Sequence, residues 1–95
     1  MSSYEGRATI RLDSGRELAV AARLHKTIIS GRTIWGGTLS VPANSQPIEL
    51  TNLPQGILII GDCEGAFIRP DVSDWLSSPA GRFEITIEGN GDAPF

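Results

Sequence analysis

Alternation of apolar and polar side chains is the feature that most restricts the fold of this 95-residue chain. Ala8, Ile10 and Leu12 alternate with polar residues, and the same period of two recurs over residues 18–24 and 83–88. Successive side chains of a β-strand point to opposite faces, whereas an amphipathic helix repeats about every 3.6 residues. No window of the sequence has a convincing helical period, so the pattern predicts an all-β fold.

The first two alternating segments are expected to pair as a hairpin. Ser14-Gly15-Arg16 supplies a three-residue loop, in which Gly15 can adopt a positive φ. This loop length predicts Leu12 opposite Leu18 and keeps the apolar side chains of both strands on one face.

A second hairpin is predicted around a two-residue Ser-Gly turn at residues 30–31. Continuing the register across this turn places Leu24 opposite Gly37 and puts Trp35 on the inner face. We therefore expect Trp35 in the core. The neighbouring Gly36 and Gly37 are interpreted as room for the indole ring and as a sharp bend or bulge at a barrel corner.

Prolines interrupt the alternation after the second hairpin. Residues 42–56 include three of them, which predicts a crossing loop with at most one short helical turn, around residues 48–53. The run ILII at residues 57–60 has apolar side chains on both faces. It predicts a strand that is central or covered on both sides.

Two later segments, residues 66–70 and 82–88, complete a set of six strands, with an irregular stretch between them. Six strands joined by short turns, without a long helix, predict a small antiparallel six-stranded barrel or a strongly bent closed sheet. At this length the chain is expected to form a single barrel-like domain over residues 1–95.

Charge is distributed unevenly, although the net charge is only −3. Residues 1–33 contain six of the eight Lys and Arg side chains, whereas residues 34–95 contain eight of the eleven Asp and Glu side chains. This dipolar distribution of charge does not indicate that the protein binds double-stranded nucleic acid. The longest run of Ile, Leu and Val has four residues, and no basic region precedes an apolar run at the N-terminus. We expect a small soluble protein, located in the cytoplasm and without a membrane partner.

Side chains that commonly carry chemistry are scarce. The chain has one histidine, His25, and one cysteine, Cys63. Alternation places His25 on the outer face of its strand, and Cys63 lies between Asp62 and Glu64, whose charges disfavour a thiolate. A zinc site needs several Cys or His ligands. We therefore expect no catalytic residues, no metal site and no cofactor, and a protein that is not an enzyme.

Surplus apolar residues gather at the tip of the second hairpin. Ile28 and Ile29 lie on opposite faces beside the turn, and Ile34 joins Ile29 on the outer face. Either the proline-rich loop covers this tip, or the tip is an exposed arm that contacts another chain. Our leading hypothesis is a non-catalytic interaction module that binds another protein, or itself, through the hairpin edge or tip.

An alternative hypothesis rests on arginines of the first hairpin. Arg7, Arg11 and Arg23 are expected to project from adjacent strands on the outer face, where they could hold an anion. The other interpretation of this face is a solvated polar surface. The predicted register puts no aromatic side chain among these arginines, which argues against single-stranded nucleic acid as the partner. A small-ligand or anion-binding domain is therefore the competing prediction.

Several short motifs are spread over most of the chain. They are Tyr4-x-Gly6-x-Ala8, the turn at Asp13 to Gly15, WGGTL at 35–39, GDCEG at 61–65, and Gly89-x-Gly91-x-x-Pro94-Phe95. Together they resemble a family of short, uncharacterised β-rich proteins of actinobacteria and their phages. The resemblance implies a small β-fold and an actinobacterial or phage-encoded accessory protein, and it brings no catalytic residues.

Overall fold

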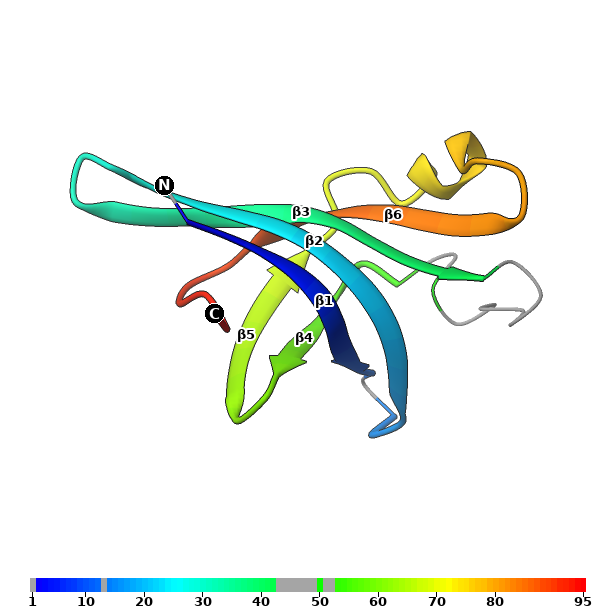
Figure 1. The fold of residues 1–95 in the computed structure, drawn as a ribbon, viewed down its shortest axis with the longest axis horizontal. Coiled ribbons are helices and arrows are strands. Elements are labelled where there is room, and N and C mark those ends of the chain that lie inside the picture. Colours follow the sequence, from blue (N-terminus) through cyan, green and yellow to red (C-terminus); the bar gives the residue numbers. More distant parts are fainter. Residues whose placement is uncertain (1, 13, 43–49, 51–52) are drawn as a thin grey trace.

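The computed structural model describes residues 2–12, 14–42, 50 and 53–95, and its fold is all-β (Figure 1). Six antiparallel strands close a barrel in the order β1-β2-β3-β6-β5-β4, so the predicted six-stranded barrel is confirmed. The strands are β1 (Ser2–Arg11), β2 (Glu17–Ile29), β3 (Arg32–Pro42), β4 (Gln55–Ile60), β5 (Cys63–Ile68) and β6 (Arg82–Gly89).

The register of the first hairpin differs from the prediction by two residues. Leu18 lies opposite Ile10 rather than Leu12. The predicted loop was too short, because the Leu12 amide donates to the Arg16 carbonyl at 2.8 Å and the Gly15 amide donates to the Leu12 carbonyl at 2.9 Å. These two hydrogen bonds lie outside the strands and close a turn that is wider than predicted. A shift of two residues leaves every side chain on its predicted face.

The second hairpin has the predicted turn and register. Ser30 and Gly31 both have positive φ, 52° and 76°, as the two central residues of a type I′ turn require. Leu24 lies opposite Gly37, and Lys26 lies opposite Trp35.

The core forms where the inner faces of the strands meet. Trp35 is only 2% exposed, and its indole Nε1–H donates to the Gly91 carbonyl at 3.0 Å. The predicted core position of Trp35 is therefore confirmed, and its one polar atom is satisfied. The other buried apolar side chains are Ala8, Ile10, Leu12, Val20, Ala22, Leu24, Leu39, Val41, Leu50, Leu53, Leu58, Phe67, Phe83, Ile85 and Ile87.

The glycines that make room for the indole are not those predicted. A Cβ on Gly89 would overlap the Trp35 ring, and one on Gly65 would lie 3.0 Å from it. Gly36 and Gly37 instead allow the neighbouring strands to approach closely, because a Cβ on either would collide with a carbonyl of a neighbouring strand. The strand pairing runs through Gly36 and Gly37 without a bulge.

Two short strand pairings close the barrel. β1 and β4 share three residue pairs, and β5 and β6 share two, whereas β1 and β2 share ten. The returning strand β5 begins at Cys63, earlier than predicted, because Gly61 and Asp62 alone form the turn after β4. In β4 the Leu58 side chain is fully buried, and the side chains of Ile57, Ile59 and Ile60 are partly covered.

A buried arginine joins the segments between the strands. Arg69 has a side chain that is 0% exposed, and its guanidinium donates to the Asp74 carboxylate at 2.7 Å and to the carbonyls of Leu50, Leu53 and Val72. Asp74 begins a 3-10 helix, η2 (Asp74–Ser77), within the stretch predicted to be irregular. The helical turn predicted around residues 48–53 lies largely outside the described residues.

Candidate functional sites: an apolar hairpin tip and an arginine-lined groove

The β2–β3 hairpin extends beyond the strands that flank it (Figure 1). Pairing with β1 ends at Lys26, opposite Ser2, and pairing with β6 ends at Gly36, opposite Glu88. Among the described residues, 27–29 and 32–34 therefore pair only with each other. Both edges of this segment have no neighbouring strand in the described part of the chain.

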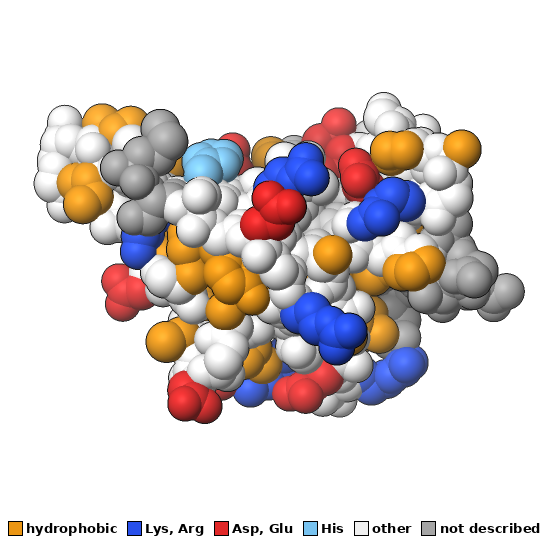
Figure 2. Space-filling model, in the orientation of Figure 1, with side chains coloured by type: hydrophobic (Ala, Val, Ile, Leu, Met, Phe, Trp, Pro, Cys, Tyr) orange, Lys and Arg blue, Asp and Glu red, His pale blue; other side chains and the backbone are white. Residues whose placement is uncertain are grey.

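Three isoleucines are exposed on this projecting segment. Ile28 is 72% exposed, Ile29 is 54% exposed and Ile34 is 51% exposed. Hydrophobic atoms are visible at the projecting end of the molecule in the space-filling view (Figure 2). The described part of the barrel does not bury this tip, and the proline-rich segment that was considered as its cover falls largely outside the described residues. We refer to residues 27–34 as the hairpin tip.

The base of the same hairpin is tightly packed. The Lys26 ammonium donates to the Phe95 carbonyl oxygen at 2.7 Å and lies 5.2 Å from the centre of the Phe95 ring. The Phe95 ring meets the Trp35 ring edge-on, at 6.2 Å between centroids, and the Tyr4 ring at 6.1 Å. This aromatic cluster holds the strands from which the hairpin tip projects.

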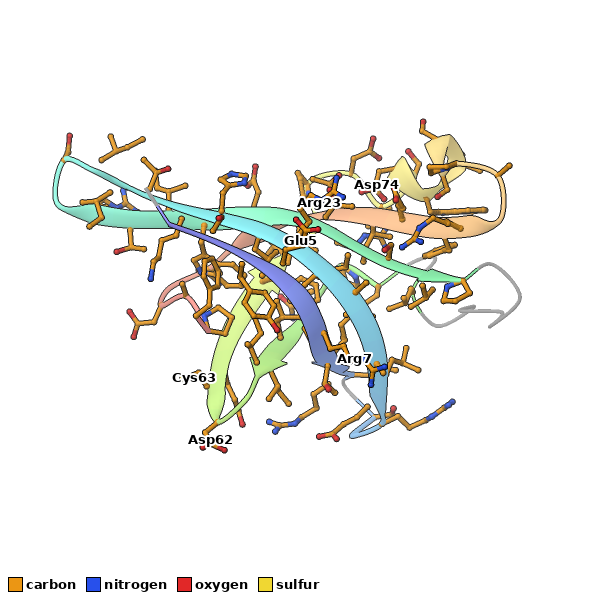
Figure 3. The ribbon with its side chains drawn as sticks, viewed as in Figure 1. Glu5, Arg7, Arg23, Asp62, Cys63 and Asp74 are labelled. Carbon is orange, nitrogen blue, oxygen red and sulfur yellow. The ribbon has the colours of Figure 1, made fainter. Side chains whose placement is uncertain are left out.

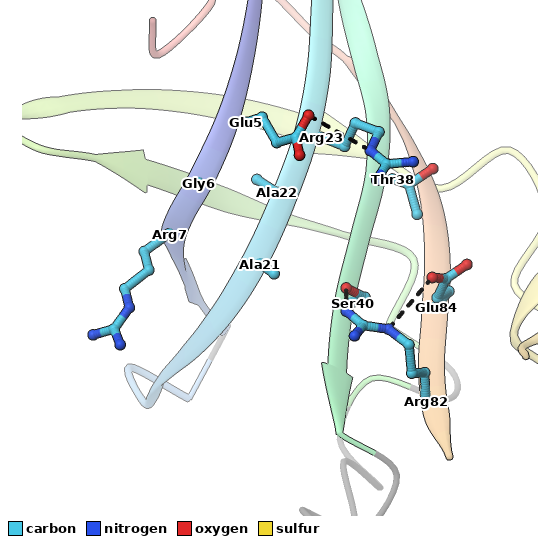
Figure 4. A pocket seen from close by; sticks show the side chains of 10 residues that line it. All are labelled: Glu5, Gly6, Arg7, Ala21, Ala22, Arg23, Thr38, Ser40, Arg82 and Glu84. Atoms are coloured by element: carbon cyan, nitrogen blue, oxygen red, sulfur yellow. Dashed lines mark hydrogen bonds and ion pairs between the residues drawn. The ribbon is translucent and has the colours of Figure 1, made fainter. Parts of the chain in front are cut away.

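The second candidate site is a groove on the outer face of four strands. Its lining comes from β1, β2, β3 and β6, and its volume is about 650 Å³ (Figure 4). Arg7 and Arg23, two of the three arginines predicted to share a face, both line it. The remaining lining residues are Glu5, Gly6, Ala21, Ala22, Thr38, Ser40, Arg82 and Glu84.

The third predicted arginine, Arg11, is occupied elsewhere. Its guanidinium donates to both carboxylate oxygens of Glu64, at 3.0 and 3.2 Å, and lies 3.8 Å from Glu17. The hydrogen bonds and charge of Glu64 raise the pKa of Arg11 above its ordinary value. Arg11 therefore faces β5 across β4 rather than the groove. The structure places Arg7 and Arg23 along the same groove and separates Arg11 from them.

Arg82 is the arginine of the groove that was not predicted from the sequence. It lies on β6, donates a hydrogen bond to the Ser40 hydroxyl and stands 3.7 Å from the Glu84 carboxylate. β6 pairs with β3 so that Ser40 lies opposite Glu84. Alternation alone placed Glu84 on the outer face, but nothing in the sequence indicated that β6 would lie beside β3.

The remaining polar candidates lie apart from one another. Cys63 and Asp62 are at the β4–β5 turn, far from Glu5 and Arg23 on the opposite side of the barrel (Figure 3). Within residues 2–12, 14–42, 50 and 53–95, no three His, Cys, Asp or Glu side chains are grouped so as to hold a metal ion. The same residues contain no helix that is long and apolar enough to cross a membrane.

Comparison with protein-family models, curated proteins and solved structures finds no match to this chain.

Proposed function

We propose that this protein is an interaction module that binds another protein, or a second copy of itself, through the hairpin tip. The exposure of Ile28, Ile29 and Ile34 on a segment without flanking strands is the observation that supports this proposal. Burial of one isoleucine side chain contributes about 1.5–3 kcal/mol, so three of them supply a substantial part of a specific association. The open strand edges add backbone groups that a partner strand can pair with.

The packed base supports the same proposal. Binding costs free energy when a flexible segment must become ordered. Trp35 and Lys26 are held in the barrel by the C-terminal residues Gly91 and Phe95, so the strands enter the hairpin tip already positioned. In this proposal the barrel is a non-catalytic scaffold, and the protein has an accessory role in the cytoplasm of an actinobacterium or in the life cycle of its phage.

The proposal is tested by replacing Ile28 and Ile29 together with serine. Both side chains are exposed, so the variant is expected to fold like the wild type. Self-association is measured by sedimentation velocity. A heterologous partner is measured by photo-crosslinking from residue 33, which lies opposite Ile28 in the hairpin, in the native host. We expect the double substitution to abolish both the self-association and the partner crosslink that the wild type gives.

Val72 and Leu76 provide a matched control. They are also exposed hydrophobic residues, at 40% and 69%, but they lie in and beside η2. Val72→Ser with Leu76→Ser removes a similar apolar surface outside the hairpin tip and should leave association unchanged. Association that survives the Ile28 and Ile29 substitutions, or that is lost equally in the control, contradicts the proposal.

A further inference from the structure

We infer that the outer-face groove is a binding site for a small phosphorylated molecule that also carries hydroxyl groups, such as a sugar phosphate. This inference concerns the face formed by β1, β2, β3 and β6 and does not depend on the hairpin tip. It revises the arginine face predicted from the sequence, because Arg82 takes the place of Arg11.

The groove owes its depth to small side chains on two central strands. Ala21 on β2 and Thr38 and Ser40 on β3 form its floor. Longer charged side chains surround this floor: Glu5 from β1, Arg23 from β2, and Arg82 and Glu84 from β6, whereas Arg7 extends from β1 away from them (Figure 4). A volume of about 650 Å³ lies within the range of roughly 300–1,000 Å³ that is usual for small-molecule sites.

Charge favours an anion in this groove. Its lining contains three arginines and two glutamates, an excess of positive charge on a chain whose net charge is −3. Guanidinium groups bind phosphate through paired, charge-assisted hydrogen bonds. Arg23 and Arg82 therefore offer donors for one phosphate group near β3, and the exposed Arg7 side chain, which points away from them (Figure 4), joins them by a change of rotamer.

The arginines of the groove are available to a ligand at little cost. Arg7 makes no ion pair or side-chain hydrogen bond with the described residues, and the Arg23 guanidinium stands 3.9 Å from Glu5 with both side chains largely exposed. Arg82 is half exposed beside Glu84. Exposed ion pairs contribute only about 0–1 kcal/mol, so a phosphate can replace the carboxylate as the partner of Arg23 or Arg82.

The other groups that line the groove indicate the chemistry of the part of the ligand that is not phosphate. No aromatic side chain lines the groove, so it offers nothing on which a nucleobase could stack. The carboxylates of Glu5 and Glu84 accept hydrogen bonds, and the hydroxyls of Thr38 and Ser40 can donate and accept them. Such groups match the hydroxyls of a sugar, while the arginines hold its phosphate.

The inference is tested with three probes, ribose phosphate, inorganic phosphate and ribose, in amide-correlation NMR titrations of the full chain. We expect saturable shifts of the Ala21, Thr38 and Ser40 amides with ribose phosphate, weaker ones with inorganic phosphate, and none with ribose at about 10 mM, ten times a weak Kd of about 1 mM. Binding of inorganic phosphate as tight as that of ribose phosphate would overturn the sugar component. The absence of any saturable shift at the groove would overturn the site.

Variants assign the binding to the arginines. Arg7→Ser and Arg82→Ser should each weaken ribose phosphate binding about tenfold, because each removes a charged hydrogen-bond donor. Arg32→Ser, an equal loss of charge at the hairpin tip, should leave the Kd unchanged. The Arg7 hydrogen bond with Tyr4 uses the backbone carbonyl of Arg7 and is kept in Arg7→Ser, so this variant tests the site even if Arg82→Ser perturbs folding. Equal weakening by Arg32→Ser and Arg7→Ser would mean that only overall charge matters and would overturn the inference.

The two proposals fail separately. The Ile28→Ser and Ile29→Ser variant leaves the groove intact and should bind ribose phosphate with the wild-type Kd. The Arg7→Ser variant leaves the hairpin tip intact and should associate like the wild type.

Discussion

The base and the tip of the β2–β3 hairpin contain the same kinds of residue but meet different surroundings. Trp35 is 2% exposed, whereas Ile34, its immediate neighbour on β3, is 51% exposed. At Trp35 the strand is covered by Gly89, Gly91 and the C-terminal Phe95. One residue further out, the flanking strand β6 has already ended. Burial in this hairpin therefore depends on where the neighbouring strands stop and on which face a side chain lies.

The largest expected effect is the difference in free energy of unfolding between substitutions at Trp35 and at Ile34. Trp35→Ala removes a buried indole and its hydrogen bond and should lower the free energy of unfolding by about 3–5 kcal/mol. Ile34→Ala removes an exposed side chain and should change it by no more than about 0.5 kcal/mol. Urea denaturation followed by circular dichroism measures both. Similar losses for the two variants would mean that the hairpin tip is part of the core.

A smaller effect is expected at Gly89, which makes room for the indole. Gly89→Ala places a methyl group where the Trp35 ring lies and should cost about 1–3 kcal/mol through overpacking. The cost should shrink when the same substitution is made in a Trp35→Phe background, because the smaller ring leaves space. A double-mutant cycle in urea measures this coupling. Additive losses would show that Gly89 is required for its backbone rather than for the ring.

The next comparison is between two cationic side chains, Lys26 at the base of the hairpin and Arg32 at its tip. Lys26→Met keeps the aliphatic stem but loses the hydrogen bond to the Phe95 carbonyl and the contact with its ring. We expect a loss of about 1 kcal/mol. Arg32→Met at the exposed turn should have an effect near zero. Thermal unfolding of the two variants, at equal net charge, decides whether the C-terminal residues hold the base of the hairpin.

The smallest expected effect is the pH-dependent stabilisation from Asp71, which lies outside the hairpin. Asp71 Oδ1 accepts hydrogen bonds from the Ser73 hydroxyl at 2.6 Å and the Ser73 amide at 2.9 Å, which lower the pKa of Asp71 below its ordinary value of 3.8. Its stabilising contribution is present above the ordinary pKa and is lost as the pH falls through the lowered one. Carboxyl NMR should find this lowered midpoint, and Ser73→Ala should raise it. An unchanged midpoint in Ser73→Ala would contradict this cause.

Much of the barrel follows from local signals. The inward positions of Ile10 and Val20 and the turn at Ser30 were predictable because alternation and turn chemistry act within one hairpin. The register of the first hairpin was not, because Leu12 and Arg16 bond to each other across the turn and alternation is equally consistent with shifts of two residues.

The candidate sites were predictable to different degrees. The isoleucines of the hairpin tip are adjacent in one hairpin, so the sequence located them. The groove combines Arg7 on β1 with Arg82 on β6, which come to line one surface only through the strand order β1-β2-β3-β6. Arg11 was predicted with them because it shares a strand face with Arg7, but Glu64 on β5 binds it instead.

The all-β class, the face of each strand and the apolar character of the hairpin tip follow from the sequence alone, because they depend on side-chain period and turn residues over short distances. Only the tertiary structure decided that β6 lies beside β3, that Gly89 leaves space for Trp35, and that Arg69 is buried among the carbonyls of Leu50, Leu53 and Val72. These contacts join residues far apart in the chain, and their partners are selected by the closing of the whole barrel rather than by any local pattern.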